Sequence, residues 1–325
     1  MALTFDELQS ITDDYFMADD RQAIDIYFSK SFIVDRWMNK KKALWDRPNG
    51  GKRIMIPLVY DIAEGGSFGR NSTLSSDDKE IINAAYFLWK HYYGNATLFL
   101  TDELEATGEH SEVSLVTSKL NAGQNKITKD ISSAIYGSAS DTAEGLTGFL
   151  SLFNTTGTTK YGNIAEDDLV ATDGTKPWKA NLTTTTEAIG LSVLRTMAST
   201  AKVDEGVGTK PNIGVMPETL LNVIKGILQA QQRFTQDSDT VKAGYTNLVF
   251  EEMILAADDY CPSGYAMLFN ERFIGFAVHA AGFFKNNPWA DLMVAGKAAR
   301  SMKIMWHGNL VCNNRKAHIA HSSLS

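Results

Sequence analysis

Two glycine-rich segments carry the residue types that can cradle a phosphate group. Gly65 to Gly69 (GGSFG) follows a run of strand-forming residues, as the phosphate loop of a dinucleotide site does. Such a site needs a helix that starts at the loop, but the residues that follow here are polar and turn-forming. Gly206 to Lys210 is followed by Pro211, where a nucleotide loop would have a magnesium-binding Ser or Thr. We therefore interpret the first segment as a flexible loop tip and reject the second as a nucleotide site.

Histidine and carboxylate side chains are the next candidates for chemistry. His318 and His321 are three residues apart, but they need a third ligand to hold a metal, and we interpret them as a surface pair. No carboxylate pair is matched to a nucleophile motif, and the chain has no G-x-S-x-G. We therefore predict no enzyme activity, no cofactor and no metal site. The adjacent carboxylates, which we interpret as solvated, are Asp13-Asp14, Asp19-Asp20, Asp77-Asp78, Asp167-Asp168, Glu251-Glu252 and Asp258-Asp259.

Composition indicates a globular chain with no strong affinity for nucleic acid or membrane. The 325 residues are 44% hydrophobic and 21% charged, enough for roughly two domains. The net charge of -7 argues against a tight phosphate grip, and we interpret the basic cluster Lys40 to Lys42 as a solvated face. The apolar runs are too short for a membrane span, and the acidic N-terminus does not resemble a signal peptide. We expect a cytoplasmic protein in which Cys261 and Cys312 are free thiols.

The elements that would position a functional surface begin with a long hairpin. Arg53 to Ile62 is rich in strand formers, and Pro57 within it favours an edge strand. Residues 63–80 are rich in Gly, Ser and acidic residues, and strand character resumes from Ala84 to Leu100. The second strand has large side chains on both faces, which indicates partners on both sides. A polar loop of this length is usually functional, so we expect an intermolecular role for this hairpin.

The remainder of the chain predicts an α+β fold without an internal repeat. An apolar stripe predicts a helix from Ser111, as N-cap, to Tyr136, and Gly123 within it costs ~1 kcal/mol relative to alanine. Further predictions are a helix over 183–201, a buried strand over 210–216, and a helix opened by Pro217 that runs to Phe234. The stripe is formed by Val113, Val116, Leu120, Ile127, Ile131 and Ile135.

In this order, the segments resemble the major capsid proteins that share the Hong Kong 97 phage fold. The similarity covers nearly the whole chain through architecture and local patterns: FLWKHYYGNATLFLTDEL (87–104), NIGVMPETLL (212–221), YAMLFNERF (265–273) and WHGNLVCNNRK (306–316). It implies an N-terminal arm (1–44), an extended hairpin called the E-loop with the start of a peripheral domain (45–100), a spine helix of that domain (101–140), an axial domain (141–280) and return strands to the peripheral domain (281–325).

The resemblance implies a protein that assembles with itself, as hexamers and pentamers, into an icosahedral shell around the phage genome. It implies a scaffolding protein and a portal as partners, decoration proteins as further partners, and a location in the virion capsid after assembly in the host cytoplasm. DNA would be enclosed without specific binding. Two alternatives stay open: an encapsulin-like nanocompartment shell, and a soluble α+β enzyme with an unrecognised site. The expected inter-subunit contacts are Phe28, Arg36, Trp37, Gly65, Gly66, Phe68, Arg70, Trp89 and Tyr93. We expect the arm and the hairpin to make few intrachain contacts, so that Phe28, Trp37, Trp89 and Tyr93 are exposed in the isolated chain.

Overall fold

The computed structural model describes residues 31–39, 44–47, 51–73, 79–105, 109–203, 209–230, 247–293 and 296–325. It divides into two compact units. Unit one contains residues 91–130 and 281–307, and unit two contains residues 31–90, 131–280 and 308–325. Three long elements contribute residues to both units: β4 (Lys90–Phe99), α4 (Glu109–Ala134) and β13 (Ala299–Cys312). No helix among these residues is long and apolar enough to cross a bilayer.

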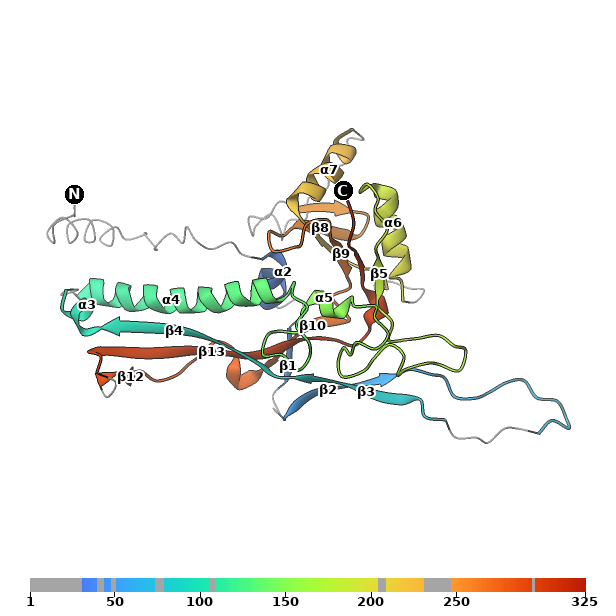
Figure 1. Ribbon diagram of the computed structural model, residues 1–325, viewed down its shortest axis with the longest axis horizontal. Coiled ribbons are helices and arrows are strands. Elements are labelled where there is room, and N and C mark those ends of the chain that lie inside the picture. Colours follow the sequence, from blue (N-terminus) through green and yellow to red (C-terminus); the bar gives the residue numbers. More distant parts are fainter. Residues whose placement is uncertain are drawn as a thin grey trace. The chain divides into compact units, whose positions relative to one another are not determined.

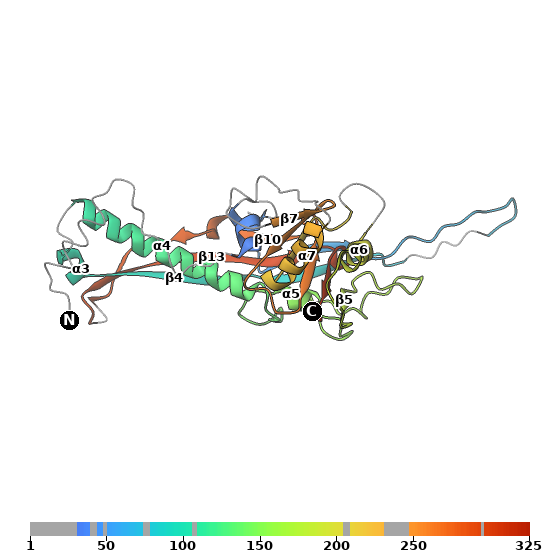
Figure 2. The same ribbon diagram turned by 90° about the horizontal axis from the view of Figure 1, so that it is seen from above.

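Unit one is built on the pairing of β4 with β13. The two short strands β11 (Lys285–Asn286) and β12 (Ala290–Asp291) pair antiparallel with the first part of β13. Helix α3 (Leu100–Glu105) follows β4 directly, and α4 then runs alongside β4 (Figures 1 and 2). The helix predicted from Ser111 to Tyr136 is confirmed, but it begins before Ser111, which is therefore not its N-cap.

Glycine at two positions allows α4 to lie directly on β4. A Cβ built on Gly94 would lie 2.1 Å from the carbonyl oxygen of Gly123, and a Cβ on Gly123 would lie 3.1 Å from the Cδ1 atom of Ile304. Gly94 has no room for a side chain, because its missing Cβ would meet the backbone of the helix, whereas a Cβ on Gly123 would press on the end of the Ile304 side chain. The close approach of strand and helix at this point accompanies the cost of Gly123 in helix propensity.

Unit two contains a mixed sheet in the order β5-β14-β9-β6-β8-β7. Helices α6 (Leu191–Thr200) and α7 (Glu218–Ala230) pack their apolar faces into one core with this sheet. Pro217 precedes α7 as predicted, whereas α6 starts later than predicted: Thr183 ends strand β5, and Glu187 forms a bridge with Leu324. The strands are β5 (Asn181–Thr183), β6 (Ile213–Met216), β7 (Asn247–Phe250), β8 (Met253–Ala257), β9 (Ala266–Phe269) and β14 (Ile319–His321).

A second set of strands in unit two joins distant parts of the sequence. β1 (Leu44–Arg47) runs parallel to β10 (Ile274–His279), and β10 pairs antiparallel with the last residues of β13. A separate two-stranded sheet is formed by β2 (Arg53–Val59) and β3 (Ile82–Leu88). The single strand predicted over 84–100 is thus two strands, β3 and β4, with Trp89 between them. Short helical turns complete the unit: α2 (Phe32–Val34), η1 (Asp35–Asn39), α5 (Phe149–Leu152) and η4 (Arg315–Ala317), while η2 (Ala280–Gly282) begins where the unit ends.

Residues 31–39, which the sequence assigned to an arm, are part of the core of unit two. Trp37 is completely buried, and its ring makes edge contacts with Phe149, Phe269 and Phe276. Arg36 forms a bidentate pair with Glu271, in which Nε lies 2.6 Å from Oε1 and Nη2 lies 3.0 Å from Oε2. The prediction that Trp37 is exposed in the isolated chain is wrong, because its aromatic ring completes an intrachain core.

Arg315 holds the irregular segment of residues 149–180 in place. Its guanidinium is buried and donates to the carbonyl oxygens of Leu152, Asn154 and Trp178 at 2.6–3.0 Å. It also lies over the ring of Tyr161, 5.2 Å from the centroid. Buried carbonyl groups need hydrogen-bond partners, and one side chain supplies them to a segment that has little regular structure.

Candidate assembly surface: the hairpin and the groove at its base

The hairpin of β2 and β3 extends beyond the rest of unit two (Figures 1 and 2). The strands pair antiparallel from Arg53 opposite Leu88 to Val59 opposite Ile82. Burial alternates strictly along β2, so one face of the hairpin is covered and the other is open. We call the open face, formed by Met55, Pro57, Val59, Ile82 and Tyr86, the outer face.

The inner face of the hairpin packs on the segment that Arg315 holds. Ala85 and Phe87 are completely buried, and the ring of Phe87 lies edge-on to Tyr161 at 5.3 Å. The Tyr86 N–H donates to the carbonyl oxygen of Gly162 at 2.8 Å. Gly162 has φ of +63°, and a Cβ there would lie 2.9 Å from the Phe87 ring. The base of the hairpin is therefore firmly attached, and the prediction that it makes few intrachain contacts is wrong for this part.

The outer face is apolar and uncovered. Met55, Val59 and Ile82 are each more than half exposed, and Ile62, just beyond the paired strands, is the most exposed large apolar side chain among the described residues. Single exposed apolar residues are ordinary, but a cluster on one face of a thin hairpin marks an interaction surface. The sequence predicted partners for large side chains on both faces. The structure shows that the inner face is packed against other residues of the same chain.

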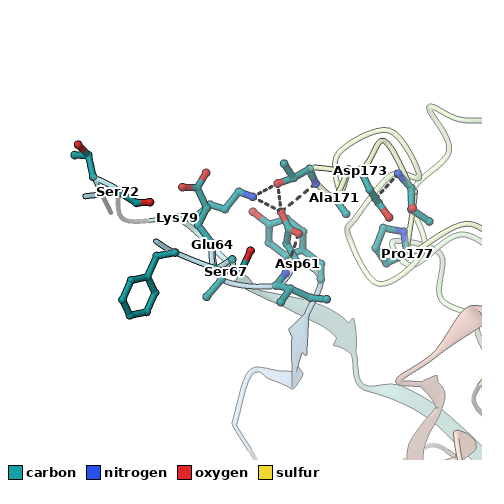
Figure 3. Close-up of a pocket in the computed structure, with 17 residues that line it drawn as sticks. Asp61, Glu64, Ser67, Ser72, Lys79, Ala171, Asp173 and Pro177 are labelled. Carbon is teal, nitrogen blue, oxygen red and sulfur yellow. Dashed lines mark hydrogen bonds and ion pairs between the residues drawn. The ribbon is translucent and has the colours of Figure 1, made fainter. Parts of the chain in front are cut away.

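A polar junction fixes the point where the hairpin leaves unit two (Figure 3). The Asp61 carboxylate accepts from the Thr172 hydroxyl at 2.7 Å and from the Thr172 N–H at 3.1 Å. The Lys79 ammonium, on the other leg of the hairpin, lies 3.3 Å from the same carboxylate and also donates to the Thr172 hydroxyl. The Thr172 hydroxyl, the Ile62 N–H and the Lys79 ammonium hold the pKa of Asp61 at about 2, below its ordinary value. Both legs are thereby tied to one loop.

This junction forms one wall of an open groove of ≈ 830 Å³. Its other residues come from the hairpin tip and from the loop at 171–177, and Figure 3 shows Glu64, Ser67 and Ser72 along the hairpin side. The tip residues are exposed, so the groove offers neither a buried nucleophile nor an enclosed space. Groups of three His, Cys, Asp or Glu that could bind a metal are also absent from the residues that the structure describes. An open polar groove beside an apolar face has the character of a protein contact surface.

The other predicted contact residues fall into separate environments. Gly65, Gly66, Phe68 and Arg70 are exposed at the hairpin tip, as expected for a loop. Phe28 lies outside the described residues.

The two remaining aromatic candidates belong to different units. Trp89 is half-buried in unit two, and its Nε1 donates to the Gly51 carbonyl at 2.8 Å. Tyr93, in unit one, is mostly exposed beneath the Lys303 ammonium, which lies 5.8 Å from the ring centroid. The predicted exposure is confirmed for Tyr93 and is only partial for Trp89.

The two C-terminal histidines are buried, which corrects their interpretation as a surface pair. His318 is completely buried, its Nδ1 accepts from the Asn270 N–H at 3.2 Å, and burial lowers its pKa to about 3. His321 pairs through Nε2 with Glu187 at 2.8 Å, and its Nδ1 accepts from the Ser323 N–H at 3.4 Å. His321 is the last residue of β14, which lies inside a sheet, and His318 directly precedes that strand.

Sequence reasoning missed the polar residues that organise unit two. Glu271 accepts from Arg36, Trp37 and Asn212, yet nothing near it in sequence marks it. Asp61 and Thr172 are similarly remote from each other. The only available signal was a lone Asp at the end of a strand, which is too common to select.

No family model and no curated protein sequence matches the chain. Among solved structures, a chain of the cyanophage A-1(L) capsid is similar with a TM-score of 0.67 and 14% identity, over 94% of this chain and 96% of that one. A capsid chain of the empty GTA particle has a TM-score of 0.60 at 10% identity, with each chain covered completely. The SrpI encapsulin of Synechococcus elongatus PCC 7942 has a TM-score of 0.55 at 10% identity, over 100% of this chain and 97% of that one. The chain has the fold of phage major capsid proteins, as the resemblance in its sequence implied.

Proposed function

We propose that this protein is the major capsid protein of a tailed phage and assembles with itself into the icosahedral head shell. The observation that carries the proposal is the outer face of the hairpin, an apolar surface that extends beyond the rest of unit two and is left exposed by the residues that the structure describes. The fold supports it, because the similar capsid chains are matched over almost their entire length.

The hairpin is suited to reach a second copy. Its base is held by the Asp61 junction and by the packing of Phe87, so its direction is defined before assembly. Its far end carries exposed Phe68 and Arg70, which can supply an apolar and a charged contact to a neighbour. A preorganised element loses less conformational entropy on binding than a free loop does. Gly65 and Gly66 at the tip, Trp89, Tyr93 and Phe28 are further proposed contacts.

The partners follow from the same proposal. The protein itself is the main partner, as hexamers and pentamers, and a scaffolding protein, a portal and decoration proteins complete the head. Assembly takes place in the host cytoplasm, and the product is the virion capsid. The net charge of -7 favours a shell that encloses DNA without binding it specifically.

A second candidate function is an encapsulin-like nanocompartment. The similarity to the SrpI encapsulin over the whole chain favours it, although with a lower TM-score than the cyanophage capsid chain. Both functions need the same closed shell, and they differ in what is enclosed.

Electron microscopy and sedimentation velocity of the purified protein test the proposal. We expect closed icosahedral particles, alone or with a co-expressed scaffold. Particles that package DNA when the portal and terminase are present support the capsid, whereas particles that retain a specific protein cargo support the nanocompartment. A chain that stays monomeric under all of these conditions contradicts both functions.

A further inference from the structure

Two histidines on neighbouring strands of unit one bring their ring nitrogens together. His91 is at the start of β4, and His307 is on β13. Their Nδ1 atoms are 2.6 Å apart, and the ring centroids are 4.7 Å apart with an interplanar angle of 74°. His91 is exposed and His307 is half-buried, so solvent reaches the pair from one side.

The surrounding backbone fixes the ring of His307. A Cβ built on Gly282 would lie 2.6 Å from the Cδ2 atom of His307, so a bare backbone turn packs against the ring. The strands on which the pair stands are held in register by neighbouring contacts. The Ser301 hydroxyl donates to the Asn95 side chain at 2.7 Å, and the rings of Tyr92 and Trp306 meet at 5.9 Å. The His307 ring is therefore held in place, whereas the exposed His91 ring has room to turn.

The contact between the two Nδ1 atoms constrains their protonation. A neutral imidazole has one N–H donor and one lone-pair acceptor, so one Nδ1 donates and the other accepts. A divalent transition metal can take the place of the shared proton. Zinc binds imidazole nitrogen at 2.0–2.1 Å, and a tetrahedral site then separates two ligand atoms by about 3.4 Å. The exposed His91 ring needs to move by less than about 1 Å to reach that separation.

We propose that His91 and His307 form an open two-histidine site for a divalent transition metal ion of the zinc, nickel or copper class. Imidazole suits these ions, whereas Mg²⁺ and Ca²⁺ prefer oxygen ligands. When the metal binds, the donating ring moves its proton from Nδ1 to Nε2 through solvent, so no net proton is released. Water fills the remaining coordination positions on the exposed side. The ion would link β4 to β13.

The number of protein ligands sets the strength of the site. The nearest lysine along the same face of β13, Lys303, is four residues from His307, and its ammonium lies over the Tyr93 ring. With two protein ligands and no carboxylate, the site is weaker than a structural zinc site, which has four protein ligands. We therefore expect binding that is saturable and reversible by a chelator.

Zinc titration of the purified protein at pH 7.5, by calorimetry after treatment with a chelator, tests the site. We expect one Zn²⁺ per chain with no comparable response to Mg²⁺. His91→Gln and His307→Gln should each weaken binding by about tenfold or more, and the double variant should be no worse than the weaker single one. His279→Gln, on β10, is the matched control and should bind as the unmodified protein does.

Hydrogen exchange supplies a second measurement. Zinc should slow the exchange of backbone amides in β4 and β13, and His91→Gln should abolish this protection. Because His91 is exposed, His91→Gln should fold even if His307→Gln does not. The zinc response of His91→Gln is therefore sufficient to test the site. Unchanged zinc affinity in His91→Gln, equal loss in His279→Gln, or no saturable binding would each overturn the proposal.

Discussion

A Cβ built on Gly94 would lie 2.1 Å from the carbonyl oxygen of Gly123, so β4 and α4 are in direct backbone contact. We predict that Gly94→Ala forces the helix away from the strand and lowers the free energy of unfolding by about 1–3 kcal/mol. Gly226→Ala is the matched control, because Gly226 lies within α7 with no atom near its missing Cβ. It should stabilise the protein by about 0.5–1 kcal/mol. Denaturant unfolding followed by circular dichroism measures both changes, and equal stability of the two variants would contradict the packing argument.

Removing the guanidinium of Arg315 should be much more costly than removing an exposed one. Arg315→Met leaves two buried carbonyl groups and one part-buried carbonyl group without this donor, and we predict a loss of about 3–5 kcal/mol. Arg195→Met is the control, since the Arg195–Glu251 pair is exposed on both sides and should contribute less than about 1 kcal/mol. Thermal unfolding compares the two variants. A small effect at Arg315 would show that water replaces the lost donors.

Stability should fall with acidification because of His318. Its pKa is about 3 in the folded protein and 6.5 when exposed, so below pH 6.5 the unfolded chain binds a proton that the folded chain does not. The free energy of unfolding then decreases by up to about 1.4 kcal/mol per pH unit as the pH falls from 6.5 towards 3. In His318→Asn the amide oxygen can replace Nδ1 as acceptor for the Asn270 N–H, and this contribution to the slope should vanish. Denaturant unfolding between pH 4.5 and 8 measures this slope at pH values above those at which Asp61 titrates. The same slope in His318→Asn and in the unmodified protein would refute the role of His318.

The two cysteines should be unreactive in the folded protein and reactive after unfolding. Both thiols are free and buried; burial raises the pKa of Cys312 to about 12 and that of Cys261 well above its ordinary value. Only the thiolate reacts readily, so labelling of the native protein near pH 8 should be slow. Under denaturing, non-reducing conditions two thiols per chain should react. Rapid native labelling would mean that unit two opens often, and no labelling after denaturation would mean a disulfide.

The outer face of the hairpin should be needed for assembly and dispensable for folding. Val59 and Ile82 are directly opposite each other, so Val59→Asp with Ile82→Lys replaces an apolar pair by an opposite-charge pair that keeps the strands together. The free energy of unfolding should change by less than about 0.5 kcal/mol. A loss of 1.4 kcal/mol at an interface weakens it about tenfold, and a shell repeats the contact in every subunit, so particles should be lost.

The control for this pair is Val203→Lys with Val223→Glu, which changes two exposed valines of unit two that lie outside the hairpin and the groove at its base. It should leave both folding and particle yield unchanged. Sedimentation velocity beside far-ultraviolet circular dichroism separates the two effects. Normal particles from the hairpin variant would refute the assembly role of the outer face.

The sequence predicted the elements whose pattern is local. The helix around Gly123, the strand before Pro217 and the hairpin were all visible, because each depends on the periodicity of its own residues. The exposure of Trp37 was predicted wrongly. The sequence pattern of an aromatic residue in a thin segment is the same whether it packs on its own chain or on another. Its contacts with Phe269 and Phe276 join positions far apart in sequence, and no local pattern reveals such pairs. His318 was misjudged for the same reason, since only the sheet shows that β14 is an internal strand.

The internal position of β14 sets an order of events in time. It pairs with β5 on one side and with β9 on the other, yet it follows every other strand of that sheet along the chain. During synthesis, at about 5–20 residues per second, β9 therefore waits with an open edge until β14 is made. An open edge is a template for pairing with other chains, and only its closure produces a finished unit two. A chain in which β14 has not yet been synthesised therefore lacks a finished unit two.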